Sequence, residues 1–431
     1  MSPGIRPIRA ILATAGLLVG WAGLVFVGTS EGWWKTSLAP HGDAARFHDA
    51  AVRLVDSANA GNAVVALIED GAVRGVHSAS VGDAVDTGTV FQVASLSKWV
   101  AAWGVMTLVE AGRLDLDAPV GQYLTRWKLP PSPFDHGKVT VRRLLSHTAG
   151  LNDGLGYAGF EPGVPVQTIE ASLTQTGDRP PGNGVSVTVG AEPGSGWQYS
   201  GGGYSILQLV IEEVSGESFE AYLQRAVLRP LGMVRSTFDW TPDAGTTLAT
   251  FYGTDAKPAP HYRFAAVAAA SLYTTGADLT RFLQAQVPGP AGQPAGRGVL
   301  SPATLAEMWK PHATAYGQDI WGLGVILYAG NQAGGFVVGH DGNNDPAINT
   351  AARINPATRN GIVVLETGSK LLASQLAGEW VWWETGNVDN IAFLIGAPKM
   401  LRLIGAGAVV ILVVGIGFAL RRRRSASAQI G

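Results

Sequence analysis

A serine and a lysine three positions apart, Ser95 and Lys98, are the residues of this sequence best suited to nucleophilic chemistry. The apolar run over residues 99–111 has helical spacing and ends before Gly112, which predicts that Ser95 lies at a helix N-terminus. Residues i and i+3 share one face of a helix, so the lysine amine would lie within hydrogen-bond reach of the serine hydroxyl. Such a pair can form an activated nucleophile, although an N-capping serine followed by a solvated lysine has the same spacing.

Two other segments carry groups that could serve the same reaction. Tyr199 follows a loop rich in proline and glycine and precedes a helix predicted over residues 205–214, where its hydroxyl could exchange a proton with Ser95. Further along, an apolar strand leads into His340 and Gly342. A glycine there lets a substrate approach the strand edge, and the backbone amides beyond it can point at an oxyanion. Taken singly, each segment also fits a structural role, as an aromatic at the core edge or the end of a hairpin.

The order and context of these three segments resemble the serine β-lactamase and penicillin-binding-protein superfamily. More narrowly, they are similar to the class C β-lactamase and D-alanyl-D-alanine carboxypeptidase family, with its Ser-x-x-Lys, Tyr-x-Asn and Lys-Thr-Gly or His-x-Gly motifs. Flanking segments with the same similarity are residues 91–95, 114–120, 140–151 and 229–233. The resemblance extends over roughly residues 45 to 370, which is most of the chain.

The resemblance implies a role for each motif residue. Ser95 would be the acylated nucleophile, and Lys98 would accept its proton or activate it electrostatically. Tyr199 would act as the base and later as the acid that serves the leaving group. His340 takes the place of the lysine of the third motif, and the backbone amides of Ser95 and Asn343 would form the oxyanion hole. Donors of this kind stabilise charge that develops only in the transition state, by roughly 3 kcal/mol each.

The second motif departs from the family pattern, because Gly201 stands where β-lactamases have an asparagine that hydrogen-bonds the substrate amide. We therefore expect substrate binding by His340, Gly342, Asn343 and the backbone at Gly201, without that amide contact. A neutral imidazole also attracts a carboxylate less strongly than lysine does at pH 7. The candidate substrates are esters, amides, D-amino-acid peptides and β-lactams, and Gly201 favours esterase or peptidase-like hydrolysis over efficient β-lactam hydrolysis. An alternative is a non-catalytic, penicillin-binding-like sensor that has lost turnover.

Composition excludes several other classes of function. The 431 residues include 31 basic and 33 acidic side chains and no cysteine, so the sequence indicates neither nucleic-acid binding nor thiolate chemistry. No clustered metal ligands and no phosphate-binding loop are recognisable, so we expect no metal and no cofactor. His147 is interpreted as a structural residue because the Ser-x-x-Lys pair already supplies a base. The expected partners are small-molecule or peptide substrates, including cell-wall derivatives, and a membrane.

Both ends of the chain carry membrane signals. Residues 10–30 are uncharged and largely apolar and follow two arginines, while residues 403–420 are apolar and run into four arginines. About twenty such residues cross a bilayer. The positive-inside rule places both termini in the cytoplasm and the domain between them outside, as a two-pass protein of the cell membrane. We expect the first span to be an uncleaved signal anchor, because Trp33 and Trp34 are typical of an interfacial belt.

The predicted organisation has three parts: a signal anchor over residues 1–40, a β-lactamase-like hydrolase domain over 41–388, and a C-terminal transmembrane helix with a basic tail over 389–431. Pro398 and Lys399 interrupt the last apolar segment, so residues 391–397 are expected to approach the membrane without joining the span.

Strands are predicted at both ends of the central domain and helices in the middle. The strands are a hairpin over 63–76 and segments 322–328, 335–338, 347–354 and 361–366; the helices are 99–111, 205–214, 219–227, 277–286 and 371–383. This order predicts an α+β fold, with an antiparallel sheet flanked by helices and a separate helical lobe.

Overall fold

The computed structural model describes residues 5–153, 158–178, 184–241 and 246–427. The chain forms two compact units. The central unit is Leu38–Thr385, and the terminal unit combines Met1–Ser37 with Gly386–Gly431.

An antiparallel sheet of eight strands organises the central unit, with the order β2-β1-β10-β9-β8-β7-β6-β5. Its strands therefore come from both ends of the unit, and β3 and β4 form a separate pair. The strands are β1 Asn62–Glu69, β2 Ala72–Ser80, β3 Val90–Gln92, β4 Tyr273–Thr275, β5 Ala313–Ala315, β6 Gln318–Trp321, β7 Ile326–Gly330, β8 Phe336–Asn344, β9 Ile348–Asn355 and β10 Asn360–Thr367.

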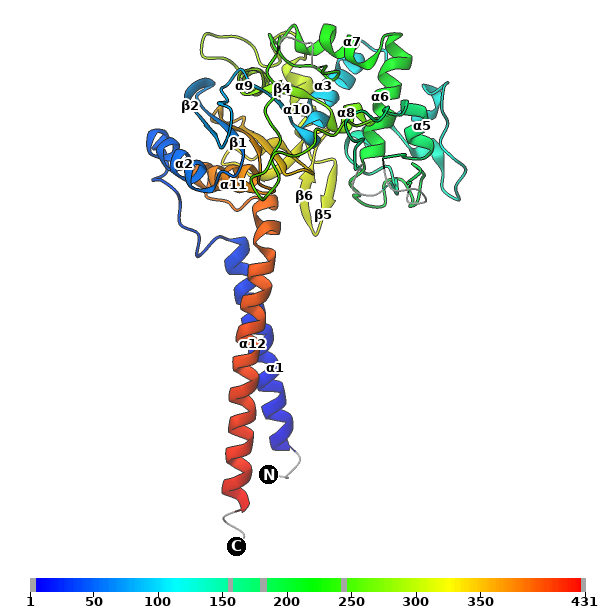
Figure 1. Ribbon diagram of the computed structural model, residues 1–431. Coiled ribbons are helices and arrows are strands. Elements are labelled where there is room, and N and C mark those ends of the chain that lie inside the picture. Colours follow the sequence, from blue (N-terminus) through cyan, green and yellow to red (C-terminus); the bar gives the residue numbers. More distant parts are fainter. Residues whose placement is uncertain (1–4, 154–157, 179–183, 242–245, 428–431) are drawn as a thin grey trace. The chain divides into compact units, whose positions relative to one another are not determined.

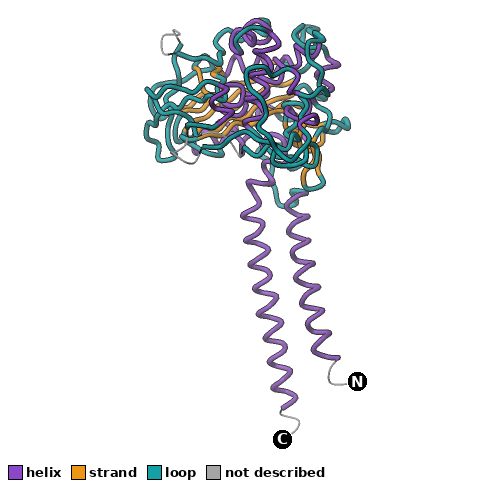
Figure 2. The backbone as a smooth tube through the Cα atoms, turned by 90° about the vertical axis from the view of Figure 1, so that its right-hand side faces the viewer, coloured by secondary structure: helices purple, strands orange, loops and turns teal. Residues whose placement is uncertain are grey.

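Helices fill the long segment between the two groups of strands and flank the sheet (Figures 1 and 2). The α-helices are α1 Ile5–Ser30, α2 Ala44–Ala58, α3 Ser97–Glu110, α4 Val141–Leu145, α5 Ile169–Thr174, α6 Gly201–Ser215, α7 Phe219–Leu223, α8 Val267–Ala270, α9 Gly276–Ala285, α10 Pro302–Met308, α11 Leu372–Thr385 and α12 Asn390–Ser427. Short turns of other helix types are η1 Ala94–Leu96, η2 Val120–Gln122, η3 His136–Lys138 and η4 Gln224–Leu228.

The sheet has different neighbours on its two faces. Asn349 and Thr350 are adjacent on β9, so their side chains point to opposite faces. Asn349 donates to the hydroxyl of Ser374 on α11 at 3.0 Å, whereas Thr350 donates to the carbonyl oxygen of Val93 at 2.9 Å. α11 therefore covers one face, and the chain that leads into η1 and α3 lies against the other.

Burial explains why the central strands do not alternate between polar and apolar residues. Every residue of β9 is buried, and so are all but one residue each of β1 and β10. These strands are covered on both faces, so alternation of polar and apolar residues is not required. β2, at the edge of the sheet, is largely exposed or half-buried.

The predicted α+β class with an antiparallel sheet is confirmed, while the start of α6 differs from its prediction. α6 begins at Gly201 rather than near Ser205, so three consecutive glycines form its first turn. Ser200 caps the helix, since its hydroxyl accepts from the N–H of Gly203 at 2.8 Å. This cap offsets the low helix propensity of glycine.

The terminal unit contains two helical segments long and apolar enough to cross a membrane, Ile11–Ser30 and Asn390–Leu420. α12 continues through Pro398 without a break. Residues 391–397 are thus part of the same helix, and the point along α12 at which the membrane begins stays a prediction. Proline removes only one backbone donor, and a long helix can continue through it.

Candidate active site

Ser95 lies in the tight turn η1, immediately before α3. Ala94 adopts a left-handed conformation with φ 48°, which is unfavourable for a residue with a side chain. The hydroxyl of Ser97 stabilises the turn by donating to the carbonyl oxygen of Ala94 at 2.6 Å and by accepting from the N–H of Leu272 at 2.9 Å. The turn presents the half-buried Ser95 side chain at the start of the helix.

Lys98 is buried, with 2% of its surface exposed, and its amine contacts Ser95 directly. Nζ donates to Ser95 Oγ at 3.2 Å and to the carbonyl oxygen of Ala269 on α8 at 2.8 Å. The amine also lies 4.9 Å from the ring centroid of Tyr199 and 5.6 Å from that of Tyr204. These contacts are with uncharged oxygens and aromatic faces.

Tyr199 is held at the loop-to-helix junction by His147. The imidazole lies 4.4 Å from the Tyr199 ring, centroid to centroid, and its Nδ1 accepts from the N–H of Ser200 at 3.1 Å. Burial, and then the nearby charge of Lys98, hold the pKa of His147 well below its usual range. This neutral histidine thus supports the second motif structurally.

Asp153 anchors the other side of the same junction. Its carboxylate accepts from the hydroxyl of Ser200 and from the N–H of Gly202, the latter at 2.6 Å. Burial raises the pKa of Asp153, while these hydrogen bonds and the charge of Lys98 oppose the rise. Gly201 lies between the two anchored residues, two positions after Tyr199.

The third motif lies within β8, where this strand extends beyond the end of its neighbour. In the described chain β7 pairs with β8 only as far as Gly339. A Cβ atom on Gly342 would lie 2.1 Å from the carbonyl oxygen of Val93, two residues before Ser95. Only glycine therefore lets β8 pass this close to the nucleophile turn. Asn343 follows, with its side-chain amide bonded to the carbonyl oxygen of Lys370.

Asp341 fixes β8 from the opposite face of the sheet. It accepts from the fully buried Arg353 at 2.8 Å and from the hydroxyl of Tyr328 at 2.6 Å. Bonds to a charged, buried group of this kind are strong and directional. They hold the strand that carries His340 and Gly342.

His340 is buried and neutral at pH 7. Burial, and then the charge of Lys98, lower its pKa to about 3. Its Nδ1 donates to the carbonyl oxygen of Asp341 at 2.6 Å, and its ring packs edge-on against Trp321 at 5.5 Å. A second cation is therefore missing at the position where the family's third motif has lysine.

Comparison with known proteins agrees with this geometry. A model of the Beta-lactamase family matches residues 47–386. The chain belongs to the beta-lactamase family. Penicillin-binding protein 4 of Amycolatopsis lactamdurans is 30% identical over 277 residues, covering 60% of this chain and 67% of that protein. The esterase EstB of Burkholderia gladioli is 32% identical over 155 residues, covering 34% of this chain and 37% of that protein.

A solved structure supports the same relationship for the fold. The octameric penicillin-binding protein homologue from Pyrococcus abyssi superposes with a TM-score of 0.63 at 25% identity, covering 78% of this chain and 76% of that one. The predicted family is confirmed. The chain spans only about a third of the length of the esterase that it matches.

In this beta-lactamase-family chain, all three predicted motifs meet around Lys98, while several supporting residues were not predicted. Asp153, Ser200 and the Ala269 carbonyl carried no motif that would have pointed to them. Trp321 was also missed; its ring lies 4.7 Å from that of His147 and 5.7 Å from that of Tyr199. Among the described residues, no three His, Cys, Asp or Glu side chains are grouped in a way that could hold a metal.

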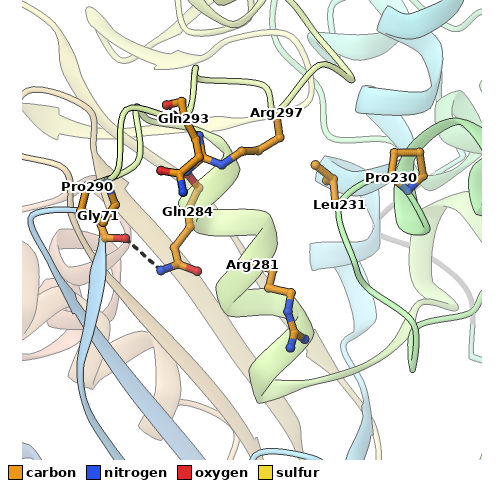
Figure 3. Close-up of a pocket in the computed structure, with 8 residues that line it drawn as sticks. All are labelled: Gly71, Pro230, Leu231, Arg281, Gln284, Pro290, Gln293 and Arg297. Carbon is orange, nitrogen blue, oxygen red and sulfur yellow. Dashed lines mark hydrogen bonds between the residues drawn. The ribbon is translucent and has the colours of Figure 1, made fainter.

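A separate pocket of about 310 Å³ involves none of the predicted site residues (Figure 3). It lies beside α9, where Gln284 donates to the carbonyl oxygen of Gly71 at 2.9 Å. Arg297 at its rim donates to the carbonyl oxygens of Gln284 at 2.7 Å and of Val287 at 2.9 Å. The guanidinium thus fastens the loop that follows α9.

Gly342→Ala should separate β8 from the nucleophile turn, because the added methyl group overlaps the Val93 carbonyl. We expect kcat/KM for p-nitrophenyl acetate to fall about 100-fold, as a displacement near 1 Å would produce. Gly330→Ala is the matched control, since a Cβ there meets nothing within 4 Å. Equal rates for the two folded variants would contradict the close approach of β8.

The depressed pKa of His340 makes the fold sensitive to acid. The unfolded chain binds a proton at this residue below about pH 6.5, whereas the folded chain binds it only near pH 3. The free energy of unfolding should therefore decrease as the pH falls through this window, by up to about 1.4 kcal/mol per pH unit for one group. Denaturant titrations of the full chain in detergent should show a shallower loss for His340→Asn. Parallel pH profiles would contradict this.

Proposed function

We propose that this protein is a serine hydrolase in which Ser95 forms a covalent acyl-enzyme. The observation that carries the proposal is the 3.2 Å contact between Lys98 Nζ and Ser95 Oγ, made by a lysine that is almost fully buried. A cap or a solvated lysine would not require burial of the amine. Membership of the beta-lactamase family supports the same assignment.

The reaction proceeds in two steps. The Ser95 hydroxyl attacks the substrate carbonyl carbon, and as the Oγ–C bond forms its proton passes to the deprotonated form of Lys98 or of Tyr199. Tyr199 then protonates the leaving group, so that the alcohol or amine departs neutral. The N–H groups of Ser95 and Asn343 stabilise the oxyanion. Water hydrolyses the acyl-enzyme and regenerates the Ser95 hydroxyl, with the same groups relaying the proton.

The substrate proposed is a small ester or amide without an essential carboxylate. The neutral His340 supplies no fixed charge for an anionic terminus, and Gly201 supplies no side chain for a substrate amide. D-amino-acid peptides and β-lactams are therefore weaker candidates, although one relative is named a penicillin-binding protein and another an esterase. A non-catalytic binding protein is the alternative outcome if turnover is absent.

The hydrolase domain is proposed to be tethered outside the cell membrane. The two apolar helices support this by their length and composition. Arginines before the first span and after the second support a cytoplasmic position for both termini. The proposed boundaries remain residues 41–388 for the hydrolase, between anchors at 1–40 and 389–431.

Removal of the nucleophile tests catalysis. Wild-type full-length protein should hydrolyse p-nitrophenyl acetate with a burst, and Ser95→Ala should lower kcat at least about a thousandfold because no acyl-enzyme forms. The matched control is Ser97→Ala, which keeps Ser95 and loses the two supporting hydrogen bonds of the turn. Hydrolysis by Ser95→Ala at the wild-type rate would contradict the proposal, and inactivity of folded wild-type protein would favour a binding protein.

Restoring the family's asparagine tests the proposed substrate preference. Gly201→Asn should raise kcat/KM for a penicillin or a D-alanyl amide about tenfold, because one hydrogen bond to the substrate amide is regained. Ester hydrolysis should change little. Steady-state assays of both substrates check this, and an equal change for ester and amide would contradict the assignment of Gly201.

A further inference from the structure

Trp21 on α1 makes a polar contact with α12 in the middle of two apolar helices. Its indole N–H lies 3.2 Å from the carbonyl oxygens of both Leu403 and Ile404. These residues are more than 380 positions apart in the sequence. The two helices run side by side in both views (Figures 1 and 2).

Gly407 creates the space that Trp21 occupies. A Cβ atom on this glycine would lie 2.0 Å from the indole nitrogen, so any larger residue would displace the ring. Gly405, two positions earlier, has nothing within 4 Å of its Cβ position. The space beside Gly407, which we call the Gly407 notch, therefore lies on the face of α12 that meets α1.

Two further contacts extend this interface in both directions. A Cβ atom on Gly415 would lie 3.3 Å from Thr14 Oγ1, toward the chain termini. At the other end, the rings of Phe26 and Phe393 meet edge-on at 5.9 Å. The contacts match an antiparallel pair of helices whose side chains interlock along their length. Small residues at such an interface let membrane helices approach closely.

We propose that α1 is a permanent membrane helix, paired with α12 through the Trp21 indole seated in the Gly407 notch. The proposal rests on the membrane anchoring proposed above. In hydrocarbon no water can satisfy an indole N–H, so its bonds to α12 favour one specific arrangement of the two helices. If α1 were a cleaved signal peptide, it would be absent from the mature protein, and the interface with α12 would not exist there. The mature protein therefore keeps α1 as half of a two-helix anchor.

Disulfide trapping in the natively cysteine-free chain tests the pairing. A Cβ atom on Gly415 would lie 3.3 Å from Thr14 Oγ1, the position that the sulfur occupies in Thr14→Cys, so the two cysteines would lie within reach of a disulfide. Full-length protein carrying Thr14→Cys and Gly415→Cys is oxidised in its membranes. We expect a monomeric product in which the tryptic peptides 10–35 and 403–421 are linked. Thr14→Cys with Gly417→Cys is the control pair, because Gly417 has nothing within 4 Å.

Substitutions at the notch then test what holds the helices together. In the background of the 14/415 cysteine pair, Gly407→Leu should reduce cross-linking at least tenfold, whereas Gly405→Leu should leave it unchanged. Trp21→Phe, which keeps an aromatic ring but removes the N–H, should reduce it less than Gly407→Leu. Cross-linking that is insensitive to Gly407→Leu would overturn the role of the notch.

Two controls separate this inference from the proposed anchoring. Resistance to alkaline extraction shows that the protein is integral to the membrane, whether or not the helices pair. Recovery of the tryptic peptide 10–35 from mature protein shows that α1 is retained. Its absence from membrane-integral protein would overturn the inference alone, while full extraction would overturn the anchoring on which it rests.

Discussion

The buried amine of Lys98 is the constraint on which the site depends. It lies between the hydroxyl of Ser95 and the carbonyl oxygen of Ala269, with two tyrosine rings nearby. Burial of an amine requires hydrogen-bond acceptors at close range. Its charge also helps to depress the pKa of His147 and His340, after burial itself. His147, which supports the second motif, and His340 of the third motif are therefore neutral, first through burial and then through the charge of Lys98.

The sheet and the helical segments bring these motifs together by different means. β8 reaches the nucleophile turn because Gly342 has no side chain and because Asp341 is bonded to buried groups on the other face. Tyr199 is held just before α6 by hydrogen bonds to the residues that follow it. His147 accepts from the N–H of Ser200, and Asp153 accepts from the hydroxyl of Ser200 and the N–H of Gly202. Neither arrangement uses substrate, so the proposed site is formed before binding. Preorganisation of this kind is a main source of catalytic rate.

Much of the fold followed from local patterns in the sequence. Strand β10 contains an uninterrupted apolar run at residues 362–365, and the β1–β2 hairpin turns at Asp70 and Gly71. The three motifs were likewise visible. Asp153 could not be predicted, because its role depends on a tertiary contact with a helix end 47 residues later. The early start of α6 was missed because its three glycines have weak helix propensity, which the local Ser200 cap and the tertiary contact with Asp153 offset.

The most direct test of the central claim is covalent labelling of the full-length protein by a fluorophosphonate, followed by intact mass. The proposed mechanism predicts one adduct that is absent from Ser95→Ala. It also predicts labelling at least about 100-fold slower in Lys98→Met, which keeps the length of the side chain but lacks the amine. An adduct that persists in Ser95→Ala, or labelling of Lys98→Met at the wild-type rate, would contradict activation of Ser95 by Lys98.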